Sequence, residues 1–426
     1  MFSIKQIEIT NFRSIDHLVI DCSQSINLFI GNNGAGKSTI LDAIRIMLSW
    51  YVARLRNPSG KGILPNDQDI NNGKSYCLLV VTLTNGVRWQ IYRQRSSSRA
   101  QSAGKSDLSE LNKHINSLFM DDRPGPLPIV AYYGVNRAVR EMPLRLAKHH
   151  RLEALDAFDG NLDDGANYRS FFEWFRERED IENEEFSHTV FPLTFPLKSY
   201  EHDNQLQAVR NAIESILPEY GSFRVQRSPR AFILQKNGKR LDFRQLSDGE
   251  KCYITLVGDI ARKLAMTHPA SSSPLLEDGI VLLDEIDLHL HPTWQTLVVP
   301  RLRKCFPSCQ FFITSHSPYV VSNIKPTDLM MVLGGDNPWR VEGQVYGAPT
   351  GELLNEYFRM PTLRNPEVQQ HIDMVWQLLA KGDTTSDAFI DGVSWLQANL
   401  PAGDNELALI AFQAKLIEKG KSNDSH

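Results

Sequence analysis

The sequence of 426 residues predicts an α/β fold around a phosphate-binding loop, with a helical insertion and a helical C-terminal region. Three observations support this prediction. Residues 31–38 (GNNGAGKS) meet the pattern G-x-x-x-x-G-K-[ST] at every fixed position, between an apolar strand at 25–30 and a helix at 39–50. An apolar strand at 279–283 ends in two adjacent acids, and another at 310–314 ends in a loop with a histidine. We expect these two later segments to complete the nucleotide site that the loop begins.

The chemistry of the loop follows from its residue types. Its glycines permit backbone angles that other residues avoid, and they let amide groups approach phosphate oxygens. Lys37 supplies a positive charge to the β- and γ-phosphates, and the hydroxyl of Ser38 suits a magnesium ligand. We therefore expect a nucleoside triphosphate with Mg²⁺. The residues expected to bind it here are Asn33, Gly34, Ala35, Gly36, Lys37, Ser38 and Thr39.

Residues 246–250 (LSDGE) resemble the signature sequence LSGGQ of ABC-type ATPases, with Asp248 and Glu250 as departures. The resemblance implies ATP as the nucleotide and head-to-tail pairing of two ATPase heads. Each ATP would then lie between the phosphate-binding loop of one chain and Ser247 and Gly249 of another. Asp248 places an acid near phosphate, which should weaken closure of the heads unless its side chain points away. Slow ATP hydrolysis is therefore expected.

The acids after the strand at 279–283 resemble a Walker B segment. Asp284 would hold magnesium, directly or through water, and Glu285 would orient or deprotonate the attacking water. A solvated strand end is the alternative, which the order of the motifs disfavours. In the loop after 310–314, His316 has the position of a switch histidine that senses the γ-phosphate, although a lone histidine after a strand is often structural.

The start of the chain indicates one branch of the ABC ATPases. Residues 4–15 (IKQIEITNFRSI) resemble the opening strand of the SMC/RecF/OLD branch of ABC ATPases. This implies an SMC/RecF-like ABC ATPase head with a P-loop NTPase fold. In that branch an arginine of this segment lies near the nucleotide, so Arg13 is a candidate phosphate contact. A surface arginine after an edge strand is the alternative.

The order of the motifs predicts four segments. Residues 1–154 form the first part of the ATPase head, and residues 155–221 form a helical insertion. Residues 222–350 complete the head with the signature and the paired acids, and residues 351–426 form a helical C-terminal region. The insertion is too short for the long coiled coil of SMC proteins, and it lacks sustained heptads.

Composition indicates a cytoplasmic protein without a membrane segment. No apolar run approaches the roughly 20 residues that span a bilayer, the first residues form no secretory signal, and the five cysteines are scattered. The net charge of −4 neither demands nor excludes nucleic acid. Three basic stretches, at 88–99, 137–151 and 224–240, would suit phosphate contacts or ordinary solvated faces equally well.

Three further segments resemble the PtuA ATPases of the Septu anti-phage system and of some retrons. They are residues 131–137 (AYYGVNR), 172–179 (FEWFRERE) and 284–292 (DEIDLHLHP). The resemblance implies a homodimer or higher homo-oligomer that pairs through its ATPase heads. It also implies a PtuB-like HNH nuclease as a separate chain, since the sequence itself contains no HNH constellation. DNA or retron RNA/DNA is a further candidate partner.

Two other readings fit the ATPase motifs. An OLD-type ATPase-nuclease would carry a TOPRIM domain after the head, and residues 341–343 resemble the acidic start of that domain. Little chain follows them and it contains no D-x-D pair, so Glu342 is interpreted as a hairpin residue. A RecF-like DNA-repair clamp ATPase is the other alternative. A neighbouring gene for an HNH nuclease or a reverse transcriptase would favour the PtuA-like interpretation.

Overall fold

The computed structural model divides the chain into two compact units, Met1–Thr350 and Gly351–His426. The residues whose structure is described are 2–96, 104–120, 123–125, 127–136, 153–162, 168–190, 203–334, 338–360 and 362–423. The basic stretch at 137–151 therefore lies entirely outside the described residues.

A six-stranded sheet forms the centre of the first unit, with the strand order β15-β14-β3-β13-β12-β8. Its strands are β3 (Ile26–Gly31), β8 (Ile129–Tyr133), β12 (Gly279–Leu283), β13 (Cys309–Thr314), β14 (Leu329–Leu333) and β15 (Trp339–Arg340). All neighbours pair in parallel except β15. Every residue of the five parallel strands is buried, because both faces of the sheet are covered. Since β13 lies between β3 and β12, the loops after these three strands meet at one edge of the sheet.

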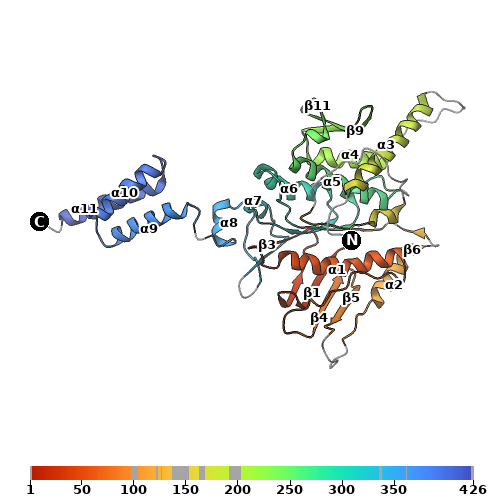
Figure 1. The fold of residues 1–426 in the computed structure, drawn as a ribbon, viewed down its shortest axis with the longest axis horizontal. Coiled ribbons are helices and arrows are strands. Elements are labelled where there is room, and N and C mark those ends of the chain that lie inside the picture. The colour runs from red at the N-terminus through yellow and green to blue at the C-terminus, as the bar shows by residue number, and fades with distance from the viewer. Residues whose placement is uncertain are drawn as a thin grey trace. The chain divides into compact units, whose positions relative to one another are not determined.

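Figure 1 shows α1 on one face of the central sheet, followed by a four-stranded antiparallel sheet of order β2-β1-β4-β5. Burial on both sides explains why apolar residues recur around most of α1. The elements of this layer are β1 (Ile4–Phe12), β2 (Ile15–Asp21), α1 (Lys37–Arg56), β4 (Tyr76–Leu83), β5 (Arg88–Gln94), α2 (Ser109–Leu118), β6 (Phe119–Met120) and β7 (Arg123–Pro124).

The opposite face of the central sheet carries α4, α5 and α6 (Figure 1). Beside them a three-stranded sheet has the order β11-β10-β9. The elements of this layer are α3 (Tyr168–Val190), α4 (Asn204–Ile216), β9 (Tyr220–Arg227), β10 (Arg230–Lys236), β11 (Lys239–Asp242), α5 (Asp248–Thr267), α6 (Pro292–Cys305) and α7 (Pro318–Val321). Short 3₁₀ helices occur at Ala154–Phe158, Phe243–Gln245 and Pro274–Leu276.

The segment 172–179 has a structural role in α3. Its aromatic side chains are buried, and Phe172 packs edge-on against Phe232 and Phe243. Its acid Glu179 is also buried; it pairs with Arg210 of α4 and accepts the backbone N–H of Val225 in β9. These contacts fix α3 to α4 and to the three-stranded sheet, so this part of the segment belongs to the core.

The second unit is helical, with α8 (Thr350–Glu356), α9 (Pro366–Ala380), α10 (Asp387–Asn399) and α11 (Asn405–Asn423). Its own core consists of Ile372, Val375, Leu379, Phe389, Leu396 and Ile410. In neither unit does a described helix combine the length and the apolar composition needed to cross a bilayer.

The α/β fold predicted from the sequence is confirmed. The strands expected at 25–30 and 310–314 differ from β3 and β13 by one residue at an end, and the strand expected at 279–283 matches β12. The helix after the phosphate-binding loop is longer than expected, since α1 runs from Lys37 to Arg56.

Candidate nucleotide-binding site

The phosphate-binding loop joins the carboxyl end of β3 to the N-terminus of α1. Two of its glycines are required for different reasons. Gly36 caps α1 with φ +94°, a left-handed conformation that other residues adopt at a cost. Gly31 lies so close to β14 that a Cβ atom would stand 2.2 Å from the carbonyl oxygen of Leu333. The loop therefore keeps its shape only with glycine at these positions.

Lys37 is buried and lies along the loop. Its Nζ donates hydrogen bonds to the carbonyl oxygens of Gly31 at 2.9 Å and Asn32 at 3.0 Å. Burial lowers the pKa of Lys37, and three carboxylates that follow β12 act in the opposite direction. Those carboxylates belong to Glu285, Asp284 and Asp287. Lys37 is therefore close enough to Asp284 and Glu285, the acids that the sequence assigns to the same site, to feel their negative charge.

The two predicted magnesium ligands lie together although they are far apart in the sequence. The hydroxyl of Ser38 donates to Oδ1 of Asp284 at 3.3 Å. A hydroxyl beside a carboxylate is a donor set that suits Mg²⁺ next to phosphate oxygens. The side chains present therefore fit the cofactors that the sequence predicts.

Thr314 organises the two acids, a role that was not predicted. Its hydroxyl, at the end of β13, donates to Oδ1 of Asp284 at 2.5 Å and accepts the backbone N–H of Glu285 at 2.7 Å. Glu285 has φ +48°, which costs a non-glycine residue about 1–3 kcal/mol. The bond to Thr314 helps to hold this conformation. The only signal in the sequence was a hydroxyl residue at the end of a core strand.

Thr314→Val is expected to lower the turnover number for ATP by about 10-fold or more, because the variant removes the acceptor of the partly buried N–H of Glu285. ATP affinity should change little. Thr314→Ser keeps the hydroxyl and is the matched control. Steady-state ATPase assays with both variants test this expectation, which fails if Thr314→Val retains the parent rate or if Thr314→Ser loses as much.

The loop after β13 is fastened to the segment after β12. Oδ1 of Asp287 accepts the hydroxyl of Ser315 at 2.6 Å and the backbone N–H of His316 at 3.3 Å. The hydroxyl of Ser317 donates to the amide oxygen of Gln295 in α6 at 2.6 Å. The main chain of His316 is therefore held by the segment after β12, which also contains Asp284 and Glu285.

The signature residues begin α5. Ser247 is its N-cap and accepts the backbone N–H of Glu250. Asp248 is 84% exposed and lies 3.4 Å from Lys251, so its side chain points into solvent. Gly249 is needed within its own chain, because a Cβ atom there would meet the carbonyl oxygen of His289 at 2.2 Å. These contacts run to α5 and to the segment after β12.

Arg13 is bound to two acids. Its Nη1 contacts Asp42 at 2.6 Å and its Nε contacts Asp69 at 2.9 Å. Burial lowers the pKa of Arg13, but the hydrogen bonds to the two carboxylates outweigh that effect and raise it. A phosphate contact by Arg13 would therefore compete with these carboxylates.

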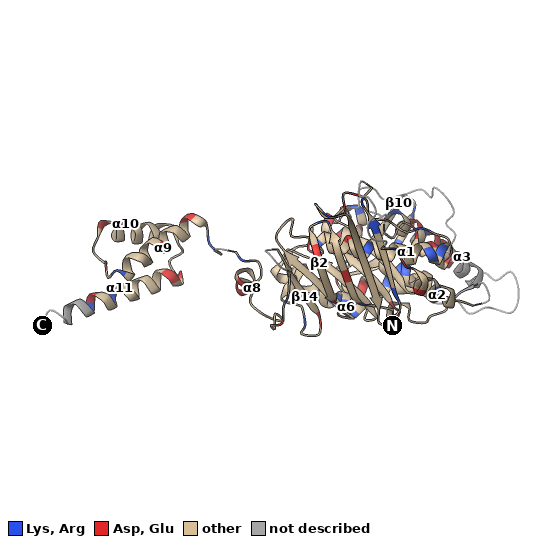
Figure 2. Ribbon diagram, turned by 90° about the horizontal axis from the view of Figure 1, so that it is seen from below, with Lys and Arg blue, Asp and Glu red and all other residues tan. Residues whose placement is uncertain are grey.

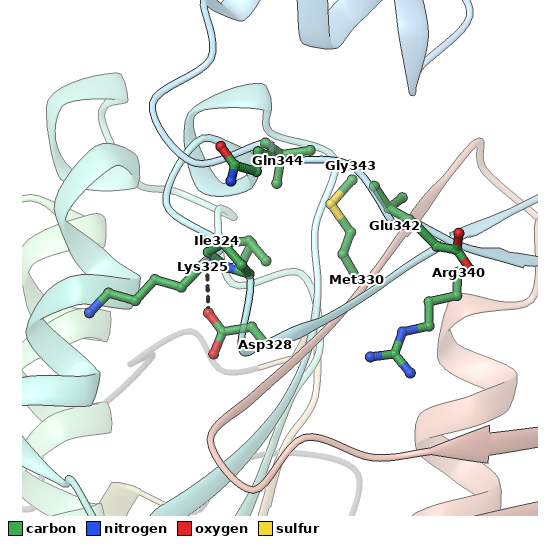
Figure 3. Close-up of a pocket in the computed structure, with 11 residues that line it drawn as sticks. Ile324, Lys325, Asp328, Met330, Arg340, Glu342, Gly343 and Gln344 are labelled. Atoms are coloured by element: carbon green, nitrogen blue, oxygen red, sulfur yellow. Dashed lines mark hydrogen bonds between the residues drawn. The ribbon is translucent and has the colours of Figure 1, made fainter.

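A cavity of about 350 Å³ lies beside β14 and β15. Figure 3 shows that its cations, Lys325 and Arg340, point in different directions. Glu342 lies two residues after the end of β15 and also lines this cavity. The charges do not converge on one point, so the cavity does not resemble a phosphate site.

The basic stretches are partly neutralised by acids. Arg93 pairs with Asp67, and Arg227 of β9 pairs with Asp180 at 2.5 Å. Figure 2 shows basic and acidic segments interspersed over the first unit. Among the described residues, Arg93 and Arg227 of these stretches are therefore already paired with acids.

Comparison with known proteins identifies the relatives of the chain. A family model described as an AAA domain matches residues 6–220, and a second AAA-domain model, whose description also names the AbiEii toxin of type IV toxin–antitoxin systems, matches residues 135–322. The "Retron Ec83 probable ATPase" of Escherichia coli is 30% identical over 85% of this chain and 77% of that protein. The "Septu protein PtuA" of Bacillus thuringiensis is 25% identical over 97% of this chain and 93% of that protein. A solved SMC head bound to the C-winged helix domain of ScpA is 15% identical, covers 80% of this chain and 97% of that chain, and has a TM-score of 0.43.

Proposed function

Because the chain belongs to the AAA-domain family and is related to the "Retron Ec83 probable ATPase", we propose that it is the nucleotide-driven switch of an anti-phage defence complex. In this proposal two heads close over ATP, and hydrolysis reopens them. The closed and open arrangements differ in how they hold a separate HNH nuclease chain of the PtuB type. The similarity to a Septu PtuA protein over nearly the whole chain supports this partner.

The observation that carries the proposal is the meeting of three loops at the edge of the central sheet. Lys37 would bind the β- and γ-phosphates, while Ser38 and Asp284 would hold Mg²⁺. When bound, the metal ion would neutralise charge on the phosphates. Glu285 would orient the attacking water, and His316 would lie near the γ-phosphate.

The second half of the site would come from another copy of the chain. Ser247 and the first amides of α5 form a helix N-terminus, which favours an anion such as the γ-phosphate. Since Asp248 points into solvent, its charge is less of an obstacle to closure than the sequence alone suggested. Affinity between heads would then depend on the nucleotide, which is the linkage that a switch needs.

The experiment that tests the proposal mixes the purified chain, a PtuB-like HNH chain and DNA across an ATP titration. Cleavage is expected only when both chains are present. A ligand that shifts the heads by a few kcal/mol can change the active fraction by about 100-fold, so cleavage should depend on ATP. Omission of each chain in turn is the control.

Two results would favour another function for this chain. Metal-dependent cleavage by this chain alone would favour the OLD-type nuclease. Tight DNA binding, without any nuclease that copurifies from its native host, would favour the RecF-like clamp. Mass analysis of the natively purified complex, with and without ATP, shows directly whether a nuclease chain copurifies.

A further inference from the structure

The acid of the signature, Glu250, is held by residues of the three-stranded sheet. Nζ of Lys236, at the end of β10, donates to Oε1 of Glu250 at 2.5 Å, and the hydroxyl of Tyr220 donates to the same oxygen. The other oxygen, Oε2, accepts the backbone N–H of Ser247 at 2.7 Å and its hydroxyl at 2.8 Å. Both oxygens of this carboxylate therefore have partners.

The pair of Lys236 and Glu250 is ionised. Burial raises the pKa of Glu250, but hydrogen bonds from Lys236, Tyr220 and Ser247 outweigh it and lower the pKa to about 2. The hydrogen bond to Glu250 is the main cause that raises the pKa of Lys236. Lys236 also lies over the ring of Tyr220, with its Nζ 5.0 Å from the ring centroid.

A charged Glu250 creates two difficulties for closure of the heads. If Ser247 contacts a γ-phosphate, the carboxylate stands about two hydrogen-bond lengths, or roughly 6 Å, from a phosphate oxygen, and the like charges repel. A serine hydroxyl also has only one proton to donate. The hydroxyl of Ser247 therefore cannot donate to Glu250 and to the phosphate at the same time. A neutral glutamine, as in the LSGGQ sequence, would avoid the repulsion.

We propose that Lys236 is the counter-ion that makes a glutamate acceptable at this signature position. It offsets the charge that Glu250 brings toward the γ-phosphate. Together with Tyr220, it also holds the carboxylate when the hydroxyl of Ser247 turns to the phosphate. Lys236 is thus a positioning residue that acts through Glu250. Because Lys236 belongs to β10, this strand is linked to the closure of two heads over ATP. This inference rests on the proposed function, because it presupposes ATP-dependent pairing of heads.

The test measures ATP-dependent dimerisation by sedimentation velocity in a Glu285→Gln background, where hydrolysis does not reopen the heads. Lys236→Met is expected to raise the dimer dissociation constant about 10-fold, because one charge is left uncompensated near phosphate. The defect should shrink at high salt. Lys239→Met, which removes an exposed lysine at the start of β11, is the matched control and should have no effect.

A second substitution distinguishes the loss of a charge from a loss of folding. Adding Glu250→Gln to Lys236→Met should restore dimerisation to the level of Glu250→Gln alone, since no charge then needs a counter-ion. Lys236→Arg should also retain dimerisation. If Lys236→Met dimerises like its parent, or if Glu250→Gln does not rescue it, the inference is wrong. If the Glu285→Gln parent itself stays monomeric in ATP, the failure belongs to the proposed function.

Discussion

Glu285→Gln is expected to bind ATP with nearly the parent affinity and to reduce its hydrolysis at least about 100-fold. The amide keeps the size of the side chain but cannot accept a proton from the attacking water. Its backbone N–H still donates to the hydroxyl of Thr314, so the unusual conformation at this position should survive. The closed dimer should then accumulate in ATP, because the step that reopens it is blocked.

Single-turnover ATPase assays and sedimentation with and without ATP measure the two halves of this expectation. Glu342→Gln is the matched control, since Glu342 is exposed and lines the cavity beside β14 and β15. It should hydrolyse ATP like the parent protein. Hydrolysis at the parent rate by Glu285→Gln would exclude Glu285 as the residue that orients water.

The parts of the site that the sequence predicted are those with a local pattern. The phosphate-binding loop needs glycines and a lysine at fixed spacing, and an apolar strand before two acids marks the end of β12. Because parallel strands end at one sheet edge, the approximate meeting of these loops follows from their order. The same reasoning predicted β3, β12 and β13 of the central sheet to within one residue, but it did not predict β14 and β15.

The contacts between segments could not be predicted in this way. Thr314 joins Asp284 to Glu285 only because β13 lies beside β12, and one threonine at a strand end is a weak signal. Gly249 is predicted to contact a nucleotide bound to another chain, and its close approach to His289 of its own chain is visible only in three dimensions. The partner of the glutamate in the signature, Lys236, comes from a different sheet and has no motif of its own.

The segment 172–179 shows a different limit. Its aromatic and charged residues indicate a family, but they do not indicate what the aromatic side chains pack against. Burial of Phe172 and the ion pair between Glu179 and Arg210 place them in the core. A periodic pattern of apolar residues reports that a face is covered. The pattern does not indicate whether the residues that bury this face belong to the same chain or to a partner.

Lys37→Ala is expected to weaken ATP binding by about 2–4 kcal/mol, or roughly 30- to 1,000-fold, because it removes the main cation that would meet the β- and γ-phosphates. The acids behind the site strengthen this expectation. With Lys37 gone, the carboxylates of Asp284 and Glu285 would face the phosphates without the cation that now opposes them. Isothermal titration calorimetry with ATP measures the loss.

The variant also removes two hydrogen bonds to carbonyl oxygens of the loop, so its folding must be checked separately. Because an intramolecular hydrogen bond contributes only about 1 kcal/mol net, the thermal midpoint should fall by only a few degrees. Lys325→Ala removes an exposed lysine of the same unit and should bind ATP normally. A folded Lys37→Ala protein with unchanged ATP affinity would show that the loop between β3 and α1 does not bind the phosphates. The loss of ATP binding should also abolish ATP-dependent pairing of heads, since closure draws its free energy from the nucleotide.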